Sequence, residues 1–298
     1  MFIETRKQGK KQKYYLVHSY RVGDKVQRIT RYLGSDLNPK ELGRLRVAAE
    51  RRIREEIKER NILEFELSER ELELFREQDA RIDIDHLQEV DWERFTKKFT
   101  YNTNAIEGSA VKQSEVSSLL DHEKTPRTAD EQEAVNVSRA VDLIRKAREP
   151  LSVGLIKKLH KICFDKTKPF AGRLRRVEVV VRDARGRVVH QGAPAKEVNH
   201  RLRELTSWYD AHKKRYPPLL LAATVHNQFE NIHPFEDGNG RVGRLLLNYV
   251  LLRHKYPPVN ILLADRARYY RTLSTFSDSG DMRPTMRFLI SQYRKQYK

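Results

Sequence analysis

The chain has 298 residues, of which 39% are hydrophobic and 34% are charged, and its formal net charge is +18. No apolar run approaches the 18 or more residues of a membrane span, so we expect no membrane association. A single cysteine, Cys163, excludes an internal disulfide, and the N-terminus lacks the apolar stretch of a secretory signal. We therefore expect a cytoplasmic globular protein with a sizeable core.

Positive charge is concentrated near the N-terminus. Residues 1–34 contain nine lysine and arginine residues against two acidic residues, a net charge of +7. Such a segment attracts nucleic acid or another polyanion, but the same composition also occurs in solvated, charge-rich appendages. Both interpretations stay open, and nucleic acid is a candidate partner of residues 1–34.

The first predicted element is a β-hairpin. Residues 13–34 are rich in aromatic and β-branched side chains on both sides of Gly23-Asp24. This pattern predicts two strands joined by a turn at the glycine. We interpret residues 1–36 as a basic β-hairpin arm.

A charged helical connector is predicted next. Asn38 precedes Pro39, and Glu41 lies three residues beyond the asparagine, which is typical of a capped helix start. The helix is expected to run from Pro39 to about Asn61. We interpret residues 37–90 as the connector, with its charged side chains facing solvent.

Residues 91–298 are predicted to form one mainly α-helical domain. Apolar residues recur with a helical period in QEAVNVSRAVDLIRKA and SVGLIKKLHKICF. A first helix over about residues 91–108 is expected to end at Gly108, because glycine suits the left-handed conformation that terminates many helices. The apolar residues 219–232 predict a central helix.

A β-hairpin interrupts this helical pattern. The segments VEVVV at residues 177–181 and VVH at residues 188–190 flank a turn near Gly186. An isolated hairpin in a helical domain often covers or clamps something, although it can also be a simple insertion. The fold class expected is therefore mainly α with two small hairpins.

The stretch HPFEDGNGRVGR, from His233 to Arg244, places polar and flexible residues directly before the apolar run LLLNYVLL. Its three glycines let backbone N–H groups approach a ligand closely. A helix N-terminus offers free N–H donors and the positive end of a dipole, so it favours phosphate. We predict that this helix begins near Arg241.

Four side chains of this stretch suit a magnesium–nucleotide site. Arg241 and Arg244 lie three residues apart, on one helical face, and both can reach an anion. Asp237 can hold Mg²⁺, which prefers oxygen ligands and phosphate. His233, with an ordinary pKa near neutrality, is a candidate general base. The alternative is a structural histidine beside a tight turn, and the absence of GK(S/T) excludes a Walker A loop.

The same stretch matches the Fic-domain signature HPFx(D/E)GNGRxxR at every fixed position, so the chain resembles the Fic family. NTNAIEGS also fits the inhibitory motif of that family, (S/T)xxxE(G/N), at Thr103, Glu107 and Gly108. Its place before the core is similar to the Fic class with an N-terminal inhibitory helix. The resemblance covers about residues 91–298.

The resemblance implies a protein adenylyltransferase that moves AMP from ATP to a Ser, Thr or Tyr hydroxyl of an unknown target protein or of itself. His233 would deprotonate the hydroxyl, and Asp237 would bind the Mg²⁺ cofactor. The nucleotide would be held by Gly238, Asn239, Gly240, Arg241, Arg244, Tyr269 and Tyr270.

The resemblance also implies inhibition within the chain. Glu107 would pair with Arg244 and deny the γ-phosphate of ATP its partner. Many relatives self-associate and thereby tune this inhibition, so a homodimer is a further expectation. In some relatives the same glutamate supports the removal of AMP, which leaves a reverse activity open.

The hairpin that follows Arg175 resembles the Fic flap, which would align a target segment as an added strand. Its residues are Val179, Val180, Val181 and Arg182. The tyrosines of the nucleotide site match a pair in relatives, and the alternative is that both are core residues. Ser277 stands where the family pattern leads us to expect Asn.

Three functions therefore stay open. The first is an autoinhibited protein adenylyltransferase. The second keeps the site but removes AMP or transfers another phosphate-containing group. The third is a nucleic-acid-binding regulator, motivated by residues 1–34, with a secondary Fic core. The intact signature favours the first.

Overall fold

The structure is a computed structural model, and it describes residues 1–9, 11–22, 25–60, 73, 76–77, 90–182, 186 and 188–297. The chain divides into two compact units, Met1–Glu66 and Leu67–Lys298. The three predicted segments, 1–36, 37–90 and 91–298, thus differ from the two units in their boundaries, and each unit is described by itself below.

The N-terminal unit is a three-stranded antiparallel sheet with a helix packed on it. The strands are β1 (Phe2–Gln8), β2 (Lys11–Val22) and β3 (Lys25–Ser35), in the spatial order β1-β2-β3. The predicted hairpin corresponds to β2 and β3, whereas β1 was not predicted. Five of its seven residues are polar or charged, so the apolar pattern that reveals strands is missing there. The turn at Gly23-Asp24 lies outside the described residues.

Helix α1 (Pro39–Arg60) covers one face of this sheet. Its start is capped as predicted: the Glu41 N–H donates to Asn38 Oδ1 at 2.9 Å, and the Asn38 N–H donates to Glu41 Oε2. Leu16, Ile29 and Ile53 form the core between sheet and helix. The helix predicted as part of a connector is therefore a packed part of the N-terminal unit.

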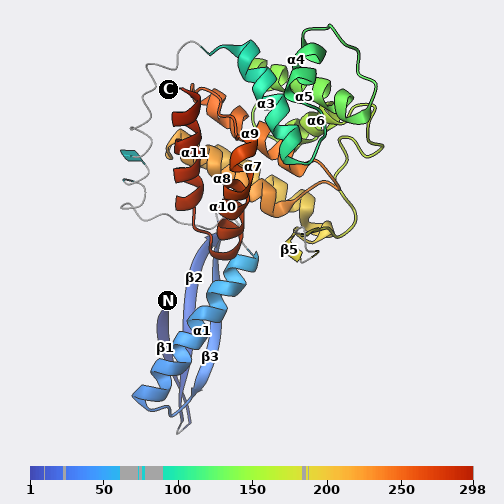
Figure 1. Ribbon diagram of the computed structural model, residues 1–298. Helices are drawn as coiled ribbons and strands as arrows, with labels where there is room; N and C mark the ends of the chain where they lie inside the picture. The colour runs from blue at the N-terminus through green and yellow to red at the C-terminus, as the bar shows by residue number, and fades with distance from the viewer. Residues whose placement is uncertain are drawn as a thin grey trace. The chain divides into compact units, whose positions relative to one another are not determined.

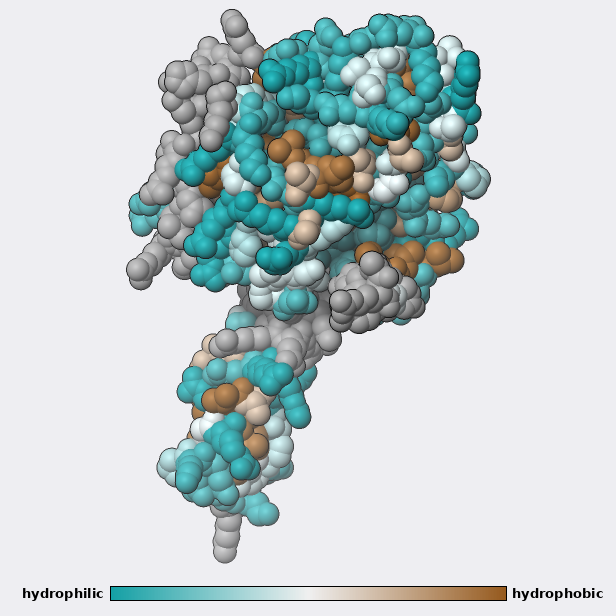
Figure 2. Space-filling view, viewed as in Figure 1, coloured by the Kyte–Doolittle hydropathy of each residue, from teal (hydrophilic) through white to brown (hydrophobic). Residues whose placement is uncertain are grey.

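The second unit is helical, which confirms the predicted fold class (Figure 1). Its described helices are α3 (Trp92–Ile106), α4 (Gln113–Leu120), α5 (Ala129–Lys146), α6 (Val153–Cys163), α7 (Val198–His212), α8 (Pro218–Ile232), α9 (Asn239–Arg253), α10 (Arg266–Ser279) and α11 (Arg283–Gln296), with short 3-10 turns at Ala195–Glu197 and Leu263–Asp265. Within the described residues, no helix is both long enough and apolar enough to cross a membrane. The face seen in Figure 2 is mostly hydrophilic.

Helices α8 and α9 form the centre of this unit. They pack against each other; α8 also contacts α7, α10 and α11, and α9 contacts α3, α5 and α6. Nearly every residue of both helices is buried, which is the expected consequence of apolar side chains on all sides. The HPFEDGNGRVGR stretch joins the end of α8 to the start of α9 and is thereby held between two buried elements.

The second hairpin consists of β4 (Val180–Arg182) and β5 (Val188–Gln191), which pair antiparallel. The predicted strand over residues 177–181 thus begins three residues too early. The reason is that the Val177 carbonyl accepts from the side chain of Arg175 at 2.8 Å, which holds this part of the chain outside the ladder. Gly186 has φ +76°, as the predicted turn requires.

One buried side chain ties the loop after α9 to the helix itself. Asn248 Oδ1 accepts from the Val259 N–H at 2.6 Å, and Asn248 Nδ2 donates to the Val259 carbonyl at 3.0 Å. The asparagine is fully buried, so an alanine would leave both backbone groups without partners away from water.

We expect Asn248→Ala to lower the free energy of unfolding by about 2–5 kcal/mol, the penalty of two unsatisfied buried groups. Urea unfolding followed by circular dichroism measures this change. Asn199→Ala, an exposed change on α7, is the matched control and should stay within about 0.5 kcal/mol of the parent. Equal effects of the two substitutions would contradict the structural role of Asn248.

Candidate active site

The candidate site lies where α8 ends and α9 begins. His233 terminates α8 in the left-handed conformation, with φ 51° and ψ 62°. A non-glycine residue adopts this conformation at an energetic cost, and such strain is often found at functional sites. The strain is held by backbone contacts: the His233 N–H donates to the Phe229 carbonyl at 3.0 Å.

Helix α9 begins at Asn239, two residues before the predicted start near Arg241, and Gly238 is its N-cap residue with φ +82°. The helix begins earlier because the Val242 N–H already donates to the Gly238 carbonyl. The N–H groups of Asn239, Gly240 and Arg241 therefore precede the first intrahelical bond. They form the positive end of the helix, where an anion is stabilised.

The side chain of Asn239 closes the loop. Its Oδ1 accepts from the Phe235 N–H and its Nδ2 donates to the Phe235 carbonyl, both at 2.9 Å. Asn239 was predicted as part of an anion nest of backbone N–H groups, and its side chain is occupied within the protein. Only its backbone is available to a ligand.

Two glycines are required by close neighbours. A Cβ atom at Gly238 would overlap the ring of Phe164, and one at Gly240 would overlap the carboxylate of Glu107. The first glycine thus permits the loop to approach α6, and the second gives Glu107 its position above the start of α9.

Glu107 forms an ion pair with Arg244, as the resemblance implied. Arg244 Nη2 lies 2.7 Å from Glu107 Oε1, and Arg244 also donates to Thr103 Oγ1 at 2.7 Å and to the Thr103 carbonyl at 2.9 Å. Glu107 is the C-cap residue of α3, and Gly108 follows it with φ +96°. The C-terminal end of α3 therefore satisfies the guanidinium of α9 through both backbone and side chain.

The two partners differ in exposure. The side chain of Arg244 is 1% exposed, whereas that of Glu107 is 28% exposed. Burial disfavours the charge of Arg244, but Glu107 outweighs this effect and keeps the pKa of Arg244 raised. The buried guanidinium is thus fixed and charged, and the carboxylate is the member of the pair that can move into solvent.

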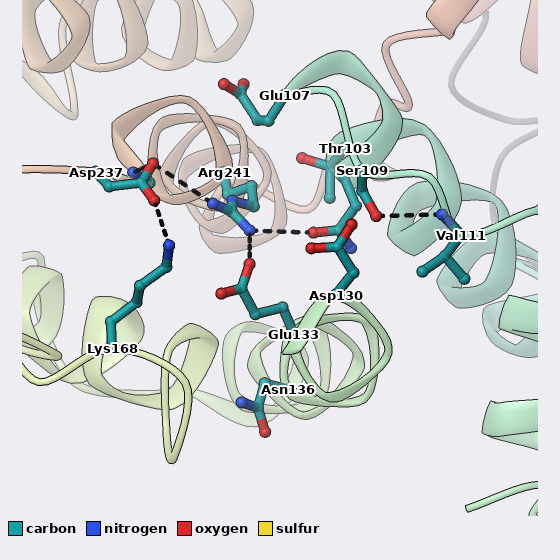
Figure 3. A network of polar contacts seen from close by, with 12 residues as sticks. Thr103, Glu107, Ser109, Val111, Asp130, Glu133, Asn136, Lys168, Asp237 and Arg241 are labelled. Carbon is teal, nitrogen blue, oxygen red and sulfur yellow. Dashed lines mark hydrogen bonds and ion pairs between the residues drawn. The ribbon is translucent and has the colours of Figure 1, made fainter. Parts of the chain in front are cut away.

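Arg241 points to a different set of partners (Figure 3). It forms a buried ion pair with Glu133 of α5, lies 3.4 Å from Asn104 Oδ1 and 3.6 Å from Asp237 Oδ1, and covers the ring of Phe164. Arg241 was predicted to contact phosphate, and here its charge is largely balanced within the protein. Glu133 was not predicted, because it belongs to an ordinary amphipathic helix.

Asp237 lies at the exposed edge of this network. One carboxylate oxygen accepts from the Gly238 N–H at 2.6 Å, and the other lies 3.2 Å from Lys168 Nζ. Burial would raise the pKa of Asp237, but Arg241 and Lys168 outweigh it and lower the pKa below its ordinary value. A half-exposed, ionised carboxylate that already faces a cation suits Mg²⁺, which often takes one or two protein carboxylates and completes its shell with phosphate and water.

The imidazole of His233 is neutral and has a defined tautomer. Its Nδ1 lies 3.3 Å from the Glu230 carbonyl, which only accepts, so Nδ1 carries the proton and Nε2 carries a lone pair. Burial, and then the nearby His190, lower the pKa of His233 to about 4. The near-neutral pKa expected from the sequence is therefore wrong, and the lone pair of Nε2 can accept a proton.

Arg175 links the second hairpin to the site. It is buried, and its guanidinium donates to four carbonyls: His233 at 2.7 Å, Val177 at 2.8 Å, Ile232 at 3.3 Å, and Ala193. These bonds fix the strained residue His233 and the chain on both sides of the hairpin. Arg175 was noted in the sequence only as a landmark before the flap.

His160 of α6 supports the loop from below, and sequence reasoning missed it. The Gly172 N–H donates to its Nδ1 at 2.8 Å, so its Nε2 carries the proton and donates to the Asp237 carbonyl at 3.0 Å. Its ring stacks on Phe235 at 3.8 Å. Burial lowers the pKa of His160 to about 4, which keeps this tautomer neutral. The sequence signal for His160 was its place on the apolar face of a predicted helix, where a buried histidine needs hydrogen-bond partners.

The tyrosine pair divides between core and surface. Tyr269 is buried; its hydroxyl lies 3.0 Å from His226 Nε2 and 3.4 Å from Arg244 Nη1. Tyr270 is 37% exposed and donates to the Ile106 carbonyl. Their nucleotide-binding role stays a prediction, and Tyr269 has the features of the core alternative. Ser277 lies 3.4 Å from His190 of β5.

The predicted flap presents exposed apolar residues beside this site. Val177 is 54% exposed and Val180 is 43% exposed. In the part of the chain that the structure describes, β4 pairs with β5 alone, so its other edge can accept a further strand. The side chain of Arg182 lies outside the described residues.

Residues 150–251, which hold α6, the hairpin, α7, α8 and most of α9, match the sequence model of the Fic/DOC family. The chain carries a Fic domain. Protein adenylyltransferase fic-1 of Caenorhabditis elegans is 28% identical over 226 residues, which is 71% of this chain and 43% of that protein. Protein adenylyltransferase Fic of Nematostella vectensis is 30% identical over 203 residues, 63% of this chain and 45% of that protein.

Solved structures of Fic proteins share the fold. A Fic domain containing signaling protein from Bacteroides thetaiotaomicron has a TM-score of 0.63 at 24% identity, covering 76% of this chain and 94% of that one. A fragment of C. elegans Fic-1 has a TM-score of 0.64 at 23% identity, covering 88% of this chain and 77% of that one. The chain spans less than half the length of the two curated relatives named above.

Buried titratable groups of this Fic domain set the pH at which it is most stable. Burial lowers the pKa of His160, His226 and His233 to about 4, 3 and 4, so below about pH 6.5 the unfolded chain binds more protons and stability falls with falling pH. Burial raises the pKa of Glu230 to about 8, so from about pH 4.5 to 8 the folded chain holds the extra proton and stability falls as pH rises.

Together these groups predict a stability maximum near pH 6.5, because three histidines outweigh one carboxyl below that pH. The expected slopes are on the order of 1–3 kcal/mol per pH unit on the acidic side and about 1 on the alkaline side. Urea unfolding at pH 5, 6.5 and 8 measures them. Glu230→Gln should remove the alkaline loss, and an unchanged loss would show that another group causes it.

Proposed function

We propose that this chain is a protein adenylyltransferase, which transfers AMP from ATP to a hydroxyl group of a protein and is inhibited by its own Glu107. Support comes from the Fic domain, from relatives named protein adenylyltransferases and from the site geometry. The observation that carries the proposal is the arrangement of His233 Nε2, Asp237 and Arg244 around the positive end of α9.

The chemical step begins with the acceptor hydroxyl. His233 Nε2 takes the hydroxyl proton while the oxygen attacks the α-phosphorus of ATP. A new O–P bond forms, the bond between the α-phosphorus and the bridging oxygen breaks, and pyrophosphate leaves with the bonding electrons. Burial of the imidazole disfavours its protonated form. The negative phosphates of bound ATP would favour that form and thereby raise the basicity of Nε2 at the moment of transfer.

The chain's groups mainly position and neutralise the triphosphate. N–H groups at the start of α9 would hold phosphate oxygens, and Arg244 would hold the γ-phosphate. Asp237 would hold Mg²⁺, which when bound supplies charge neutralisation at the phosphates. Arg241, already paired with Glu133 and Asn104, keeps Asp237 ionised and oriented.

Inhibition follows from competition for one guanidinium. Glu107 Oε1 lies 2.7 Å from Arg244 Nη2, at the place that a γ-phosphate oxygen would need. The carboxylate also repels the phosphate. ATP can bind only with its terminal phosphate displaced from Arg244, which leaves the α-phosphate badly oriented for attack.

The acceptor would be presented by β-strand addition. The unpaired edge of β4, flanked by the exposed Val177 and Val180, would align an extended segment of a target protein or of this chain itself. Backbone pairing would fix the position of the segment without depending on its side chains.

We expect Glu107→Gly to raise AMP transfer at least tenfold, because each 1.4 kcal/mol of barrier removed increases a rate tenfold. The measurement uses ATP labelled on the α-phosphate and follows label on protein. Glu123→Gly, an exposed glutamate in a loop, is the matched control and should leave transfer unchanged. No rise for Glu107→Gly would refute inhibition by this residue.

In the Glu107→Gly background, His233→Ala should abolish the signal, because the proposed step needs the His233 imidazole to take the hydroxyl proton. Persistent labelling would refute His233 as the base. Label delivered from γ-labelled ATP would indicate phosphate transfer, and loss of AMP from a pre-labelled protein by the wild-type chain would indicate the reverse activity.

A further inference from the structure

The sheet of the N-terminal unit has one face that α1 does not cover. Side chains alternate between the two faces of a strand, and Leu16 of β2 packs toward α1 with Ile29 and Ile53. Its neighbours Tyr15 and Val17 therefore lie on the opposite face. The strand register places the residues of this second face, here called the open face, side by side across the three strands.

The open face is positively charged. The register assigns to it Arg6 of β1, Lys11 and Lys13 of β2, and Arg28 of β3, with Arg6 directly opposite Lys13. Glu4 is the one acidic residue in the sequence of the three strands. Among the side chains that the structure describes, four cations against one anion give this face a net charge of +3.

That single carboxylate is already neutralised. Glu4 pairs with Arg6 at 2.7 Å and with Arg28 from the far strand. The Glu4–Arg28 pair joins the two outer strands and therefore spans β2. In the strand register it crosses β2 at Val17, which is fully buried. The pair thus covers the centre of the sheet and leaves a donor-rich, cationic surface above it.

Two tyrosines hold the cationic side chains in place. The rings of Tyr15 and Tyr32 lie 5.3 Å apart, and Tyr32 is 55% exposed. The Arg6 guanidinium lies 4.6 Å above Tyr15, and Lys13 Nζ lies 5.9 Å from the centre of Tyr32. Cation–π contacts of this kind restrict flexible side chains before binding, so less entropy is lost when they meet an anionic partner.

We propose that the open face binds duplex DNA, with the three strands in the major groove and the four cations on the flanking phosphates. Neighbouring strands lie about 4.8 Å apart, so three strands span roughly 10 Å, which fits the major groove of about 12 Å in B-form DNA. Sheets are known to bind in this groove. The deep, narrow major groove of double-stranded RNA would not admit the sheet.

The helix on the other face does not share this charge excess. The three strands contain eight basic residues and one acidic residue, whereas the 22 residues of α1 contain eight basic and five acidic residues. Charge complementarity therefore selects the sheet as the DNA-binding surface. This inference is independent of the proposed enzymatic function.

The test measures binding of the full chain to a fluorescein-labelled 24-base-pair duplex of mixed sequence, by anisotropy over a range of NaCl concentrations. Four phosphate contacts predict a slope of about −3.6 for log K against log salt. Lys11→Gln/Lys13→Gln should reduce the size of this slope by about 2 and weaken binding at least about tenfold at 50 mM NaCl.

Matched controls separate position from total charge. Lys40→Gln/Arg44→Gln removes the same charge from exposed positions on α1 and should leave the slope unchanged. Lys11→Arg/Lys13→Arg keeps the charge and should bind like the parent. Circular dichroism melting checks that each variant is folded.

Three results would overturn the proposal. The parent chain could fail to bind the duplex at 50 mM NaCl. The α1 control could weaken binding as much as the sheet variant, which would indicate attraction by net charge alone. Double-stranded RNA of the same sequence, or heparin, could bind as tightly as DNA, which would show that the groove is not recognised.

Discussion

The buried guanidinium of Arg244 requires an anionic partner, and much of the site follows from this requirement. A charge that is almost completely removed from water is costly unless it is paired and hydrogen-bonded. Here Glu107 supplies the charge and Thr103 supplies two further acceptors, from a helix that lies 137 residues earlier in the sequence. The same requirement makes the site suited to a triphosphate, because a phosphate oxygen can replace the carboxylate.

The rest of the site is held rigidly, which confines the change to Glu107. Arg175 binds four carbonyls around the hairpin and His233, and the side chain of Asn239 closes the loop on itself. His160 fixes the Asp237 carbonyl. Glu107, by contrast, caps a helix end, is partly exposed and is followed by a glycine. Under the proposed function, a partly exposed carboxylate beside an otherwise fixed site would switch the activity without remodelling the fold.

The sequence predicted those parts of the site that are local in the chain. His233, Asp237 and the two arginines lie within twelve residues, and the resemblance added Glu107 through a second short motif. Glu133, by contrast, is distant in sequence and belongs to an unremarkable helix, so only the folded chain places it beside Arg241. The mutual position of such residues is set by tertiary packing, which short-range patterns do not encode.

The fold shows the same division between local and non-local information. The helical core, the capped start at Asn38 and the hairpin before α7 follow from periodicity and turn residues. Strand β1 was missed because its residues are mostly polar or charged, and it becomes a strand by pairing with β2 over its whole length. Its partner stabilises it, so its own propensity is a poor guide.

The central claim is that Glu107 and the γ-phosphate of ATP exclude each other at Arg244. Crystal structures of the wild-type chain and of Glu107→Gly, each with a non-hydrolysable ATP analogue and Mg²⁺, test it directly. The account predicts that the γ-phosphate binds Arg244 in the variant, while in the wild type Glu107 keeps Arg244 and the γ-phosphate lies elsewhere. A wild-type complex in which Arg244 binds both, or a variant whose γ-phosphate avoids Arg244, would contradict it.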